Sequence, residues 1–391
     1  MRTRNRKKSQ GGFTLTELTV VVLLTTISST FIYFLFEHNS RIYNIQNDLS
    51  NAQAHLRYAS ARLQRDLNRA GYMGIINQSD KRLCVPLGMP PLDRSLDAIF
   101  FQDGQFRVNA NQNFLEADRI YLFGNFDTNE DFDATIINNT QIRVQYDPRT
   151  FDLASFKRVF YNTGQLLLMK GSNGKYQVIQ VNATGNITSA YSSRVLNIAP
   201  TGLRLRRTAF CGATGRVRIS PLRRIRYEMR NLGSYRYEIR RTSMYPICTS
   251  AGTSNITCNW RDMVSTSPHP PFVVAEYATD LQFWFSRVQN GVLYGYNPLA
   301  RVGLPQRANI DNDIHPPFLQ PQLPFLRSVF FRISVRTMAD DRSFVMRSRG
   351  GSRLGALRTP MLGFNVDPNP LTAARVRSIV KHVQLNNFLI P

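Results

Sequence analysis

Residues 13–70 of this 391-residue chain contain neither glycine nor proline, the two residues that most often end or kink an α-helix. One continuous helix over this stretch would be ~87 Å long, because each residue adds ~1.5 Å. Its first part, Phe13–Phe36, is apolar on all sides apart from one carboxylate, Glu17. A segment of this length can cross a hydrocarbon core of ~30 Å. We therefore predict that the first half of the helix spans a membrane.

The second half of this helix carries a single apolar stripe. After Glu37, apolar residues recur at spacings of three and four, at Ile42, Ile45, Leu49, Ala52, Leu56, Ala59, Leu63, Leu67 and Ala70. A stripe of this kind on an otherwise polar helix predicts that one face is buried, and we expect it to pack against the chain's own globular part. Gly71 and Gly74 are predicted to end the helix.

Beyond residue 74 the patterns are those of β-strands. Short apolar-rich runs at residues 156–161, 165–170 and 176–181 are separated by the turn sequences NTG and GSNG, which predicts a meander. The clearest hairpin is predicted over residues 224–230 and 235–241, on either side of NLGS. There Ile225, Tyr227 and Met229 alternate strictly with Arg226 and Glu228.

Two further strands are predicted near the C-terminus, over residues 329–335 and 378–385, while long excursions are expected near residues 85–150 and 287–325. The predicted fold class is therefore α+β. A long N-terminal helix, with its hydrophobic half protruding, packs on an antiparallel β-sheet that carries large loop and strand insertions. No G-x-S-x-G, P-loop or G-x-G-x-x-G motif is present, so we expect no enzyme, no cofactor and no metal centre.

The chain is strongly basic. Lys and Arg number 49 against 26 Asp and Glu, a net charge of +23. Five of these bases precede Gly12, which predicts a cytoplasmic N-terminus and an exported remainder. Removing residues 1–12 leaves 44 − 26 = +18. Such a surface attracts polyanions, including nucleic acid; alternatively, the excess arginine only keeps an exported protein soluble and pairs with neighbouring subunits.

Four cysteines all fall in the part predicted to be exported. An even number there favours two disulfides, for which three connectivities exist. Cys248 and Cys258 flank the turn-rich segment TSAGTSNIT, so we pair them locally and leave Cys84 with Cys211 by elimination. The alternative is that the four residues are buried free thiols.

The segment Gly12-Phe13-Thr14-Leu15-Thr16-Glu17-Leu18 resembles the prepilin signature of type IV pilins and type II secretion pseudopilins. It shares a basic leader, Gly directly before the apolar run, Phe first after it, and Glu fifth in the mature chain. Weaker similarity continues into ARLQRDLNRAGYMG, which resembles the PilW-type minor pilins. FVVAEYATDLQFWF, LRSVFFRISVRTM and VRSIVKHVQLNNF are similar to that family and to the J-type pseudopilins. Residues 85–270 match no pattern that we can place.

This resemblance implies that prepilin peptidase cuts between Gly12 and Phe13 and methylates the new amino group of Phe13. Glu17 would then pair with the positive amine of Phe13 on an adjacent subunit, because two desolvated charges are tolerated together where either alone is expensive. The implied fold is pilin-like. Its parts are a leader over residues 1–12, a membrane or filament-core half over 13–36, an amphipathic half over 37–74 and a β-rich head over 75–391.

The function that the resemblance implies is that of a minor pilin, a structural subunit that helps to initiate or cap a type IV pilus, at or near the tip. Its partners would be prepilin peptidase, other minor pilins, the major pilin and a tip adhesin. It would start in the bacterial inner membrane as a single-pass protein and end in an extracellular pilus. The alternatives are a minor pseudopilin in a periplasmic pseudopilus of a type II secretion system, and a basic tip module that binds DNA or acidic surface ligands.

Two other patterns in the head are candidate sites. The arginines Arg223, Arg224, Arg226, Arg236 and Arg240 lie among tyrosines, as in nucleic-acid surfaces. The alternative is a solvated sheet face with cross-strand Arg–Glu pairs. Asp127, Asn129, Asp131 and Asp133 have the spacing of a calcium loop. They lack its sixth-position glycine and its final glutamate, and an acidic surface turn is the alternative.

Overall fold

The computed structural model describes residues 14–74, 82–84, 97–106, 117–138, 141–147, 149, 152–160, 165–181, 189–190, 193–197, 215–232, 237–251, 255–263, 270–289, 292–295, 326–337, 376–385 and 387. The chain divides into two compact units, Met1–Asn51 and Ala52–Pro391. Helix α1, Leu15–Arg69, begins in the first unit and ends in the second. Its bounds agree with the predicted continuous helix.

In the first unit, the part of α1 that the structure describes is apolar and exposed. Each residue from Leu15 to Phe36 is exposed. By length and composition this helix could cross a membrane, since an 18-residue window of it is sufficiently apolar. An exposed apolar surface of this size needs lipid or other protein to cover it.

In the second unit, the stripe on α1 becomes part of the hydrophobic core. Six of its nine predicted residues are buried, namely Ala52, Leu56, Ala59, Leu63, Leu67 and Ala70. The prediction is wrong for the other three, which lie in the first unit: Ile42 is exposed, and Ile45 and Leu49 are half-buried. The helix ends where Gly71 adopts a positive φ of 71°, a conformation that glycine accepts without steric cost. Both the stripe and the terminating glycine were predicted from the sequence.

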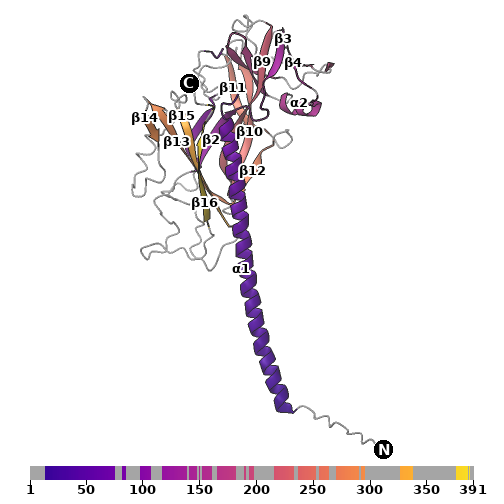
Figure 1. Cartoon of the computed structure of the whole chain (residues 1–391), viewed down its shortest axis with the longest axis vertical. Helices are drawn as coiled ribbons and strands as arrows, with labels where there is room; N and C mark the ends of the chain where they lie inside the picture. Colours follow the sequence, from indigo (N-terminus) through magenta and orange to yellow (C-terminus); the bar gives the residue numbers. More distant parts are fainter. Residues whose placement is uncertain are drawn as a thin grey trace, which may run out of the picture. The chain divides into compact units, whose positions relative to one another are not determined.

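The described strands form two antiparallel sheets (Figure 1). The larger sheet comprises β1 (Ile99–Phe106), β2 (Ala117–Gly124), β3 (Phe132–Asn138), β4 (Gln141–Gln145), β5 (Leu166–Gly171), β6 (Tyr176–Gln180), β7 (Ser189–Ala190), β8 (Ser193–Asn197), β9 (Arg216–Asn231), β10 (Tyr237–Ala251), β11 (Asn255–Asp262) and β12 (Phe272–Glu276). The smaller sheet has the order β14–β13–β15–β16. Its strands are β13 (Ala278–Gln289), β14 (Val292–Gly295), β15 (Leu326–Arg336) and β16 (Val376–Gln384).

Strand β9 is shared by two hydrophobic cores. Its second half pairs with β2 and β10 and directs Ile225, Tyr227 and Met229 into the core that contains the α1 stripe. Its first half pairs with β3 and β5 and directs Val217 and Ile219 into a separate core, which contains no residue of α1 among those described. The head is therefore built as two lobes joined along one long strand.

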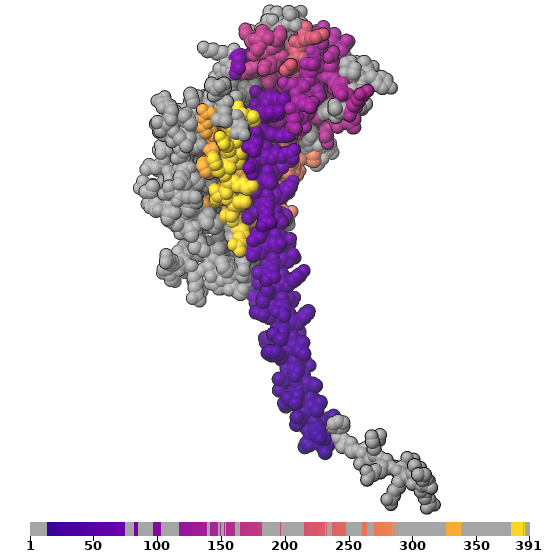
Figure 2. Space-filling model, viewed as in Figure 1, coloured from indigo at the N-terminus to yellow at the C-terminus, as the bar shows by residue number. Residues whose placement is uncertain are grey.

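The smaller sheet closes the first core beside α1. Val329, Phe331, Ile333 and Val335 of β15 are fully buried, which confirms the predicted alternation. The last strand, β16, lies beside the C-terminal turns of α1 in Figure 2. There the Lys381 ammonium donates to the Gln64 side chain over 3.1 Å.

The predicted hairpins are confirmed, but one predicted strand is wrong. Strands β9 and β10 pair around residues 232–236, and β5 and β6 pair around the GSNG turn. In contrast, residues 153–160 form helix α2 (Leu153–Phe160). Asp152 caps this helix by accepting the Ser155 N–H over 2.7 Å. Hydrogen bonds from the Ser155 side chain and then from its backbone lower the pKa of Asp152. Phe156, Val159 and Phe160 are buried at helical spacing.

The predicted excursion over residues 85–150 is also wrong in part, because β1 to β4 lie within residues 99–145. Most of the excursion predicted over residues 287–325 lies outside the described residues, as do Gly12, Phe13, Cys211 and Arg236.

Candidate functional site

The first described turn of α1 places Glu17 against Thr14. The Thr14 N–H and the Thr14 hydroxyl both donate to Glu17 Oε2 over 3.0 Å, and the Glu17 N–H donates back to Thr14 Oγ1 over 3.3 Å. This reciprocal pattern is a capping box, which satisfies backbone donors at a helix start. The sequence analysis missed it, although Thr14-Leu15-Thr16-Glu17 carries its T-x-x-E signal.

Glu17 therefore has two physical interpretations in this chain. As part of a capping box it stabilises its own helix start by accepting hydrogen bonds from Thr14. As the one charged residue between Leu15 and Phe36, it could also meet a positive group on another molecule. Both interpretations use the same carboxylate, whose Oε2 accepts both bonds from Thr14.

A buried carboxylate fixes the C-terminal part of α1 to the larger sheet. Asp66 is 2 % exposed, and its Oδ2 accepts the Tyr227 hydroxyl and the Arg241 Nε–H, each over 2.6 Å. Arg62 lies one helical turn away, with Nε 3.8 Å from the same oxygen. Burial and the neighbouring Asp66 charge hold the pKa of Tyr227 well above its usual value. At neutral pH the phenol therefore keeps its proton and donates a hydrogen bond to Asp66.

The end of α1 contacts the end of β2 through backbone atoms. The Gly71 N–H donates to the Phe123 carbonyl over 2.9 Å, and the Asn125 N–H donates to the Tyr72 carbonyl over 3.0 Å. Between them, Gly124 approaches the helix so closely that a Cβ there would lie 2.6 Å from the Arg69 carbonyl oxygen. Only glycine fits at this contact.

The segment after β2 completes this junction. Arg69 donates to the Phe126 carbonyl over 2.9 Å and to the Asn129 side chain over 2.6 Å. The Tyr72 hydroxyl donates to the Asn129 carbonyl over 3.0 Å. The end of α1 and the segment after β2 are thus held together by several hydrogen bonds.

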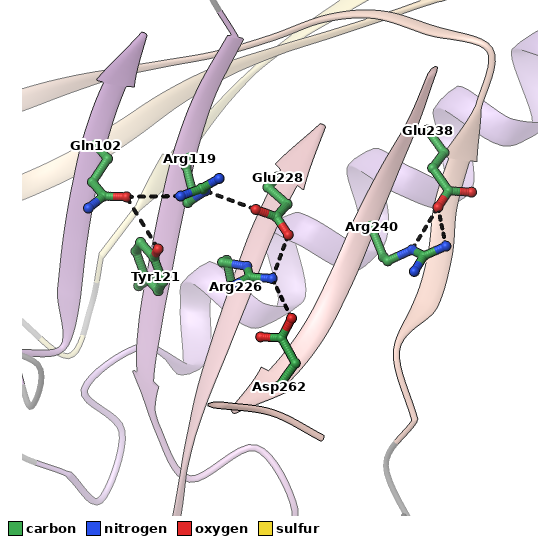
Figure 3. Close-up of polar contacts among 8 residues, drawn as sticks. All are labelled: Gln102, Arg119, Tyr121, Arg226, Glu228, Glu238, Arg240 and Asp262. Carbon is green, nitrogen blue, oxygen red and sulfur yellow. Dashed lines mark hydrogen bonds and ion pairs between the residues drawn. The ribbon is translucent and has the colours of Figure 1, made fainter. Parts of the chain in front are cut away.

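On the sheet face opposite α1, polar side chains form a continuous chain of contacts across four strands (Figure 3). Gln102 accepts from Arg119 and Tyr121 of β2. Arg119 Nε lies 2.9 Å from Glu228 on β9. The chain continues through Arg226, whose Nη2 lies 2.5 Å from Glu228 and 2.8 Å from Asp262 on β11. Positive and negative groups alternate along it, so its net charge is zero.

The four described arginines of the predicted polyanion patch are engaged within the fold. Arg223 is buried, with Nη2 2.6 Å from Asp127 Oδ2. The Arg224 guanidinium lies 4.4 Å from the Tyr121 ring centroid and 4.7 Å from that of Trp260. Arg226 belongs to the chain of contacts above, and Arg240 pairs with Glu238 (Figure 3). This geometry favours the Arg–acid pairs of the alternative interpretation, but that interpretation is wrong in expecting a solvated face, because Arg223 and Arg224 are buried.

Burial and neighbouring charges shift the pKa values of Arg223 and Arg226 in opposite directions. Burial lowers the pKa of Arg223, and Asp127 opposes that effect. For Arg226, burial also acts to lower the pKa, but the charges of Glu228 and Asp262 outweigh it, so the pKa is raised. Arg226 is therefore held firmly in its charged form.

In the segment with the spacing of a calcium loop, residues 127–133, each of the four polar side chains contacts a different partner. Asp127 pairs with Arg223 and Asn129 accepts from Arg69. Asp131 accepts the Ser220 hydroxyl, and Asp133 lies 3.9 Å from Arg218. Within the described ranges, no group of three or more His, Cys, Asp or Glu residues is arranged to hold a metal ion.

The backbone places two predicted partner cysteines side by side. Cys248 of β10 is directly opposite Cys258 of β11 in the antiparallel register. Cys84 is disulfide-bonded, and its predicted partner Cys211 lies outside the described residues. The pairing of the four cysteines stays a prediction.

Comparisons of the chain with protein-family models, with curated proteins and with solved structures give no match.

Proposed function

We propose that this chain is a non-catalytic structural subunit of a type IV pilin-like filament, in the manner of the PilW-type minor pilins, and that it helps to initiate or cap assembly near the filament tip. The observation that carries the proposal is the start of α1. From Leu15 to Phe36 the helix is apolar and exposed, with Glu17 as its one charged residue. A carboxylate within such an apolar segment is costly in lipid, which makes it a functional candidate.

The proposal divides the chain by task. Gly12 and Phe13 form the processing site, and the freed amine of Phe13 on a neighbouring subunit is the partner of Glu17. Residues 13–36 hold the protein in the bacterial inner membrane, with the N-terminus cytoplasmic, and later pack in the filament. Asp66, Gly71 and Gly124 hold the C-terminal turns of α1 against the larger sheet of the head.

The cysteines fit an exported head. We infer two disulfides, Cys248 with Cys258 and Cys84 with Cys211. The in-register opposition of the first pair supports the local connectivity, and an oxidising compartment is where such bonds persist.

Two substitutions separate the two interpretations of Glu17. The variant Glu17→Ala removes both docking and capping, whereas Thr14→Val removes the capping hydroxyl and leaves the acid. In cells that carry each variant in place of the native chain, Glu17→Ala should be processed and membrane-bound but should reduce surface filaments. Thr14→Val should assemble nearly normally.

Surface filaments are counted by electron microscopy. The amount of processed protein in the membrane fraction shows that each variant is made and inserted. If Thr14→Val impairs assembly as much as Glu17→Ala, Glu17 acts only through its own helix start. Normal filaments in Glu17→Ala would reject docking altogether. The variant Gly12→Leu should leave the unprocessed, longer chain, visible as a mobility shift.

A further inference from the structure

The second lobe presents an exposed basic sheet face that the sequence analysis did not predict. Antiparallel register places directly opposed residues on the same side of a sheet. One row across β5, β9 and β3 contains Lys170, Arg218 and Asp133. The next row, two residues along, contains Arg216 opposite Thr135 and Thr135 opposite Arg143.

This face is open to solvent and its cations are weakly neutralised. Lys170, Arg143 and Arg216 are exposed. The Arg218 and Asp133 side chains are 70 % and 77 % exposed and lie 3.9 Å apart, so their pairing is worth little in water. Asp131, two residues before Asp133, accepts a hydrogen bond from the Ser220 hydroxyl. Four bases against these two acids leave a charge of 4 − 2 = +2.

Arg226, in the second half of β9, is paired with acids much more closely than the arginines in the first half. It is held between Glu228 and Asp262 at 2.5 and 2.8 Å. In the first half, Arg216 and Arg218 point outward with one acid, Asp133, at the edge of ion-pair distance. A single strand thus carries a neutralised face in one lobe and a cationic face in the other.

The shape of this face fits the sugar–phosphate backbone of a duplex. Lys170 on β5 and Arg143 on β4 are three strand spacings apart, which is roughly 14 Å. That distance is comparable to the ~12 Å width of a DNA major groove, so bases at both edges can reach phosphates on both sides of it. The Tyr176 ring, opposite Lys170, lies beneath the Arg82 guanidinium at 5.7 Å. It is therefore covered and does not offer a platform for stacking single-stranded bases.

We propose that this face, formed by Arg143, Lys170, Arg216 and Arg218, binds the phosphate backbone of duplex nucleic acid without base specificity. The inference does not depend on filament assembly, because it concerns a surface of the head alone. The binding is driven by counterion release, so the affinity falls with salt at a slope near −0.9 per phosphate contacted.

The test uses the full-length chain in non-ionic detergent and a short fluorescent DNA duplex, followed by anisotropy between about 50 and 200 mM salt. The wild type should bind with a log–log salt slope of about −3.6, since four bases each contact one phosphate. The double variant Arg216→Ser/Arg218→Ser should weaken binding at least tenfold at ~50 mM salt and make the slope shallower by about 2. Asp133→Asn should tighten binding, since it removes an acid from the face.

A matched control removes the same charge elsewhere. Arg57 and Arg65 of α1 are exposed, and Arg57→Ser/Arg65→Ser should change the affinity by less than about twofold. Because all four arginines are exposed, the two double variants should unfold at the same denaturant concentration as the wild type. Three results would overturn the proposal: no salt-dependent binding by the wild type, equal losses in both double variants, or binding to anionic vesicles or acidic polysaccharide without binding to the duplex.

Discussion

Asp66 Oδ2 and Arg241 Nε lie 2.6 Å apart in the first core, where the two side chains are 3 % and 7 % exposed. Asp66 belongs to α1 and Arg241 to β10, so this buried bond joins the helix to the larger sheet. The Tyr227 hydroxyl of β9 shares the same oxygen. Truncating Asp66 leaves a buried cation and a buried phenol without their acceptor.

We therefore predict that Asp66→Ala destabilises the head by about 3–5 kcal/mol, the usual effect of breaking a buried ion pair from one side. Exposed Arg57 on the same helix provides the control, and Arg57→Ala should change stability by less than about 0.5 kcal/mol. Urea unfolding followed by tryptophan fluorescence measures both. An effect below about 1 kcal/mol for Asp66→Ala would mean that this bond does not hold the helix.

Tyr227 predicts a dependence of stability on alkaline pH. Its pKa is raised in the folded protein, first by burial and then by Asp66. Between the unfolded value near 10 and the higher folded value, the folded state binds one more proton, so stability falls as pH rises above about 10. The variant Tyr227→Phe should cost about 1–3 kcal/mol at neutral pH, and its stability should fall less steeply above pH ~10. Identical slopes in the two proteins would contradict this.

Gly124 predicts a strong steric effect at the end of α1. A Cβ at Gly124 would lie 2.6 Å from the Arg69 carbonyl, whereas one at Gly74 would have its nearest neighbour at 3.4 Å. We expect Gly124→Ala to destabilise the head by about 2 kcal/mol or more, since the contact is with backbone that cannot rotate away. Gly74→Ala should cost less than about 1 kcal/mol. Equal melting temperatures for the two variants would reject the close contact.

The cysteine pairing predicts a specific cross-linked peptide. Protease digestion of the native, non-reduced protein should release one fragment in which Cys248 and Cys258 are joined, detectable by mass spectrometry and lost on reduction. Replacing both by serine should lower stability by about 2–3 kcal/mol, as expected for a short closed loop. A fragment that joins Cys84 to Cys248 would contradict the pairing.

The sequence patterns predicted the elements whose periodicity is long and regular. The α1 stripe from Ala52 onward, the glycine end at Gly71 and the alternation of β15 all depend on local spacing, and all agree with the structure. Helix α2 was missed because it is short, with its apolar residues close together. A capping Asp152 ahead of Phe156, Val159 and Phe160 was the signal available.

The parts of the candidate site that depend on long-range pairing were not predicted. Asp66 falls on the apolar stripe, and a carboxylate there could have been recognised as buried, but its partners Tyr227 and Arg241 are distant in sequence. Likewise, arginines recur along the whole of β9, and the sequence around them does not show which ones are paired with an acid. Which of them are neutralised depends on the acids that the fold brings close, such as Asp262 of β11 near Arg226 and Asp133 of β3 near Arg218.

The most direct test of the filament proposal is the N-terminus of the native protein. Intact-mass analysis and N-terminal sequencing of the chain purified from its own membranes should show a protein that begins at Phe13 and carries one additional methyl group. A native chain that begins at Met1, or one that begins beyond residue 30 and so lacks Glu17, would contradict the account.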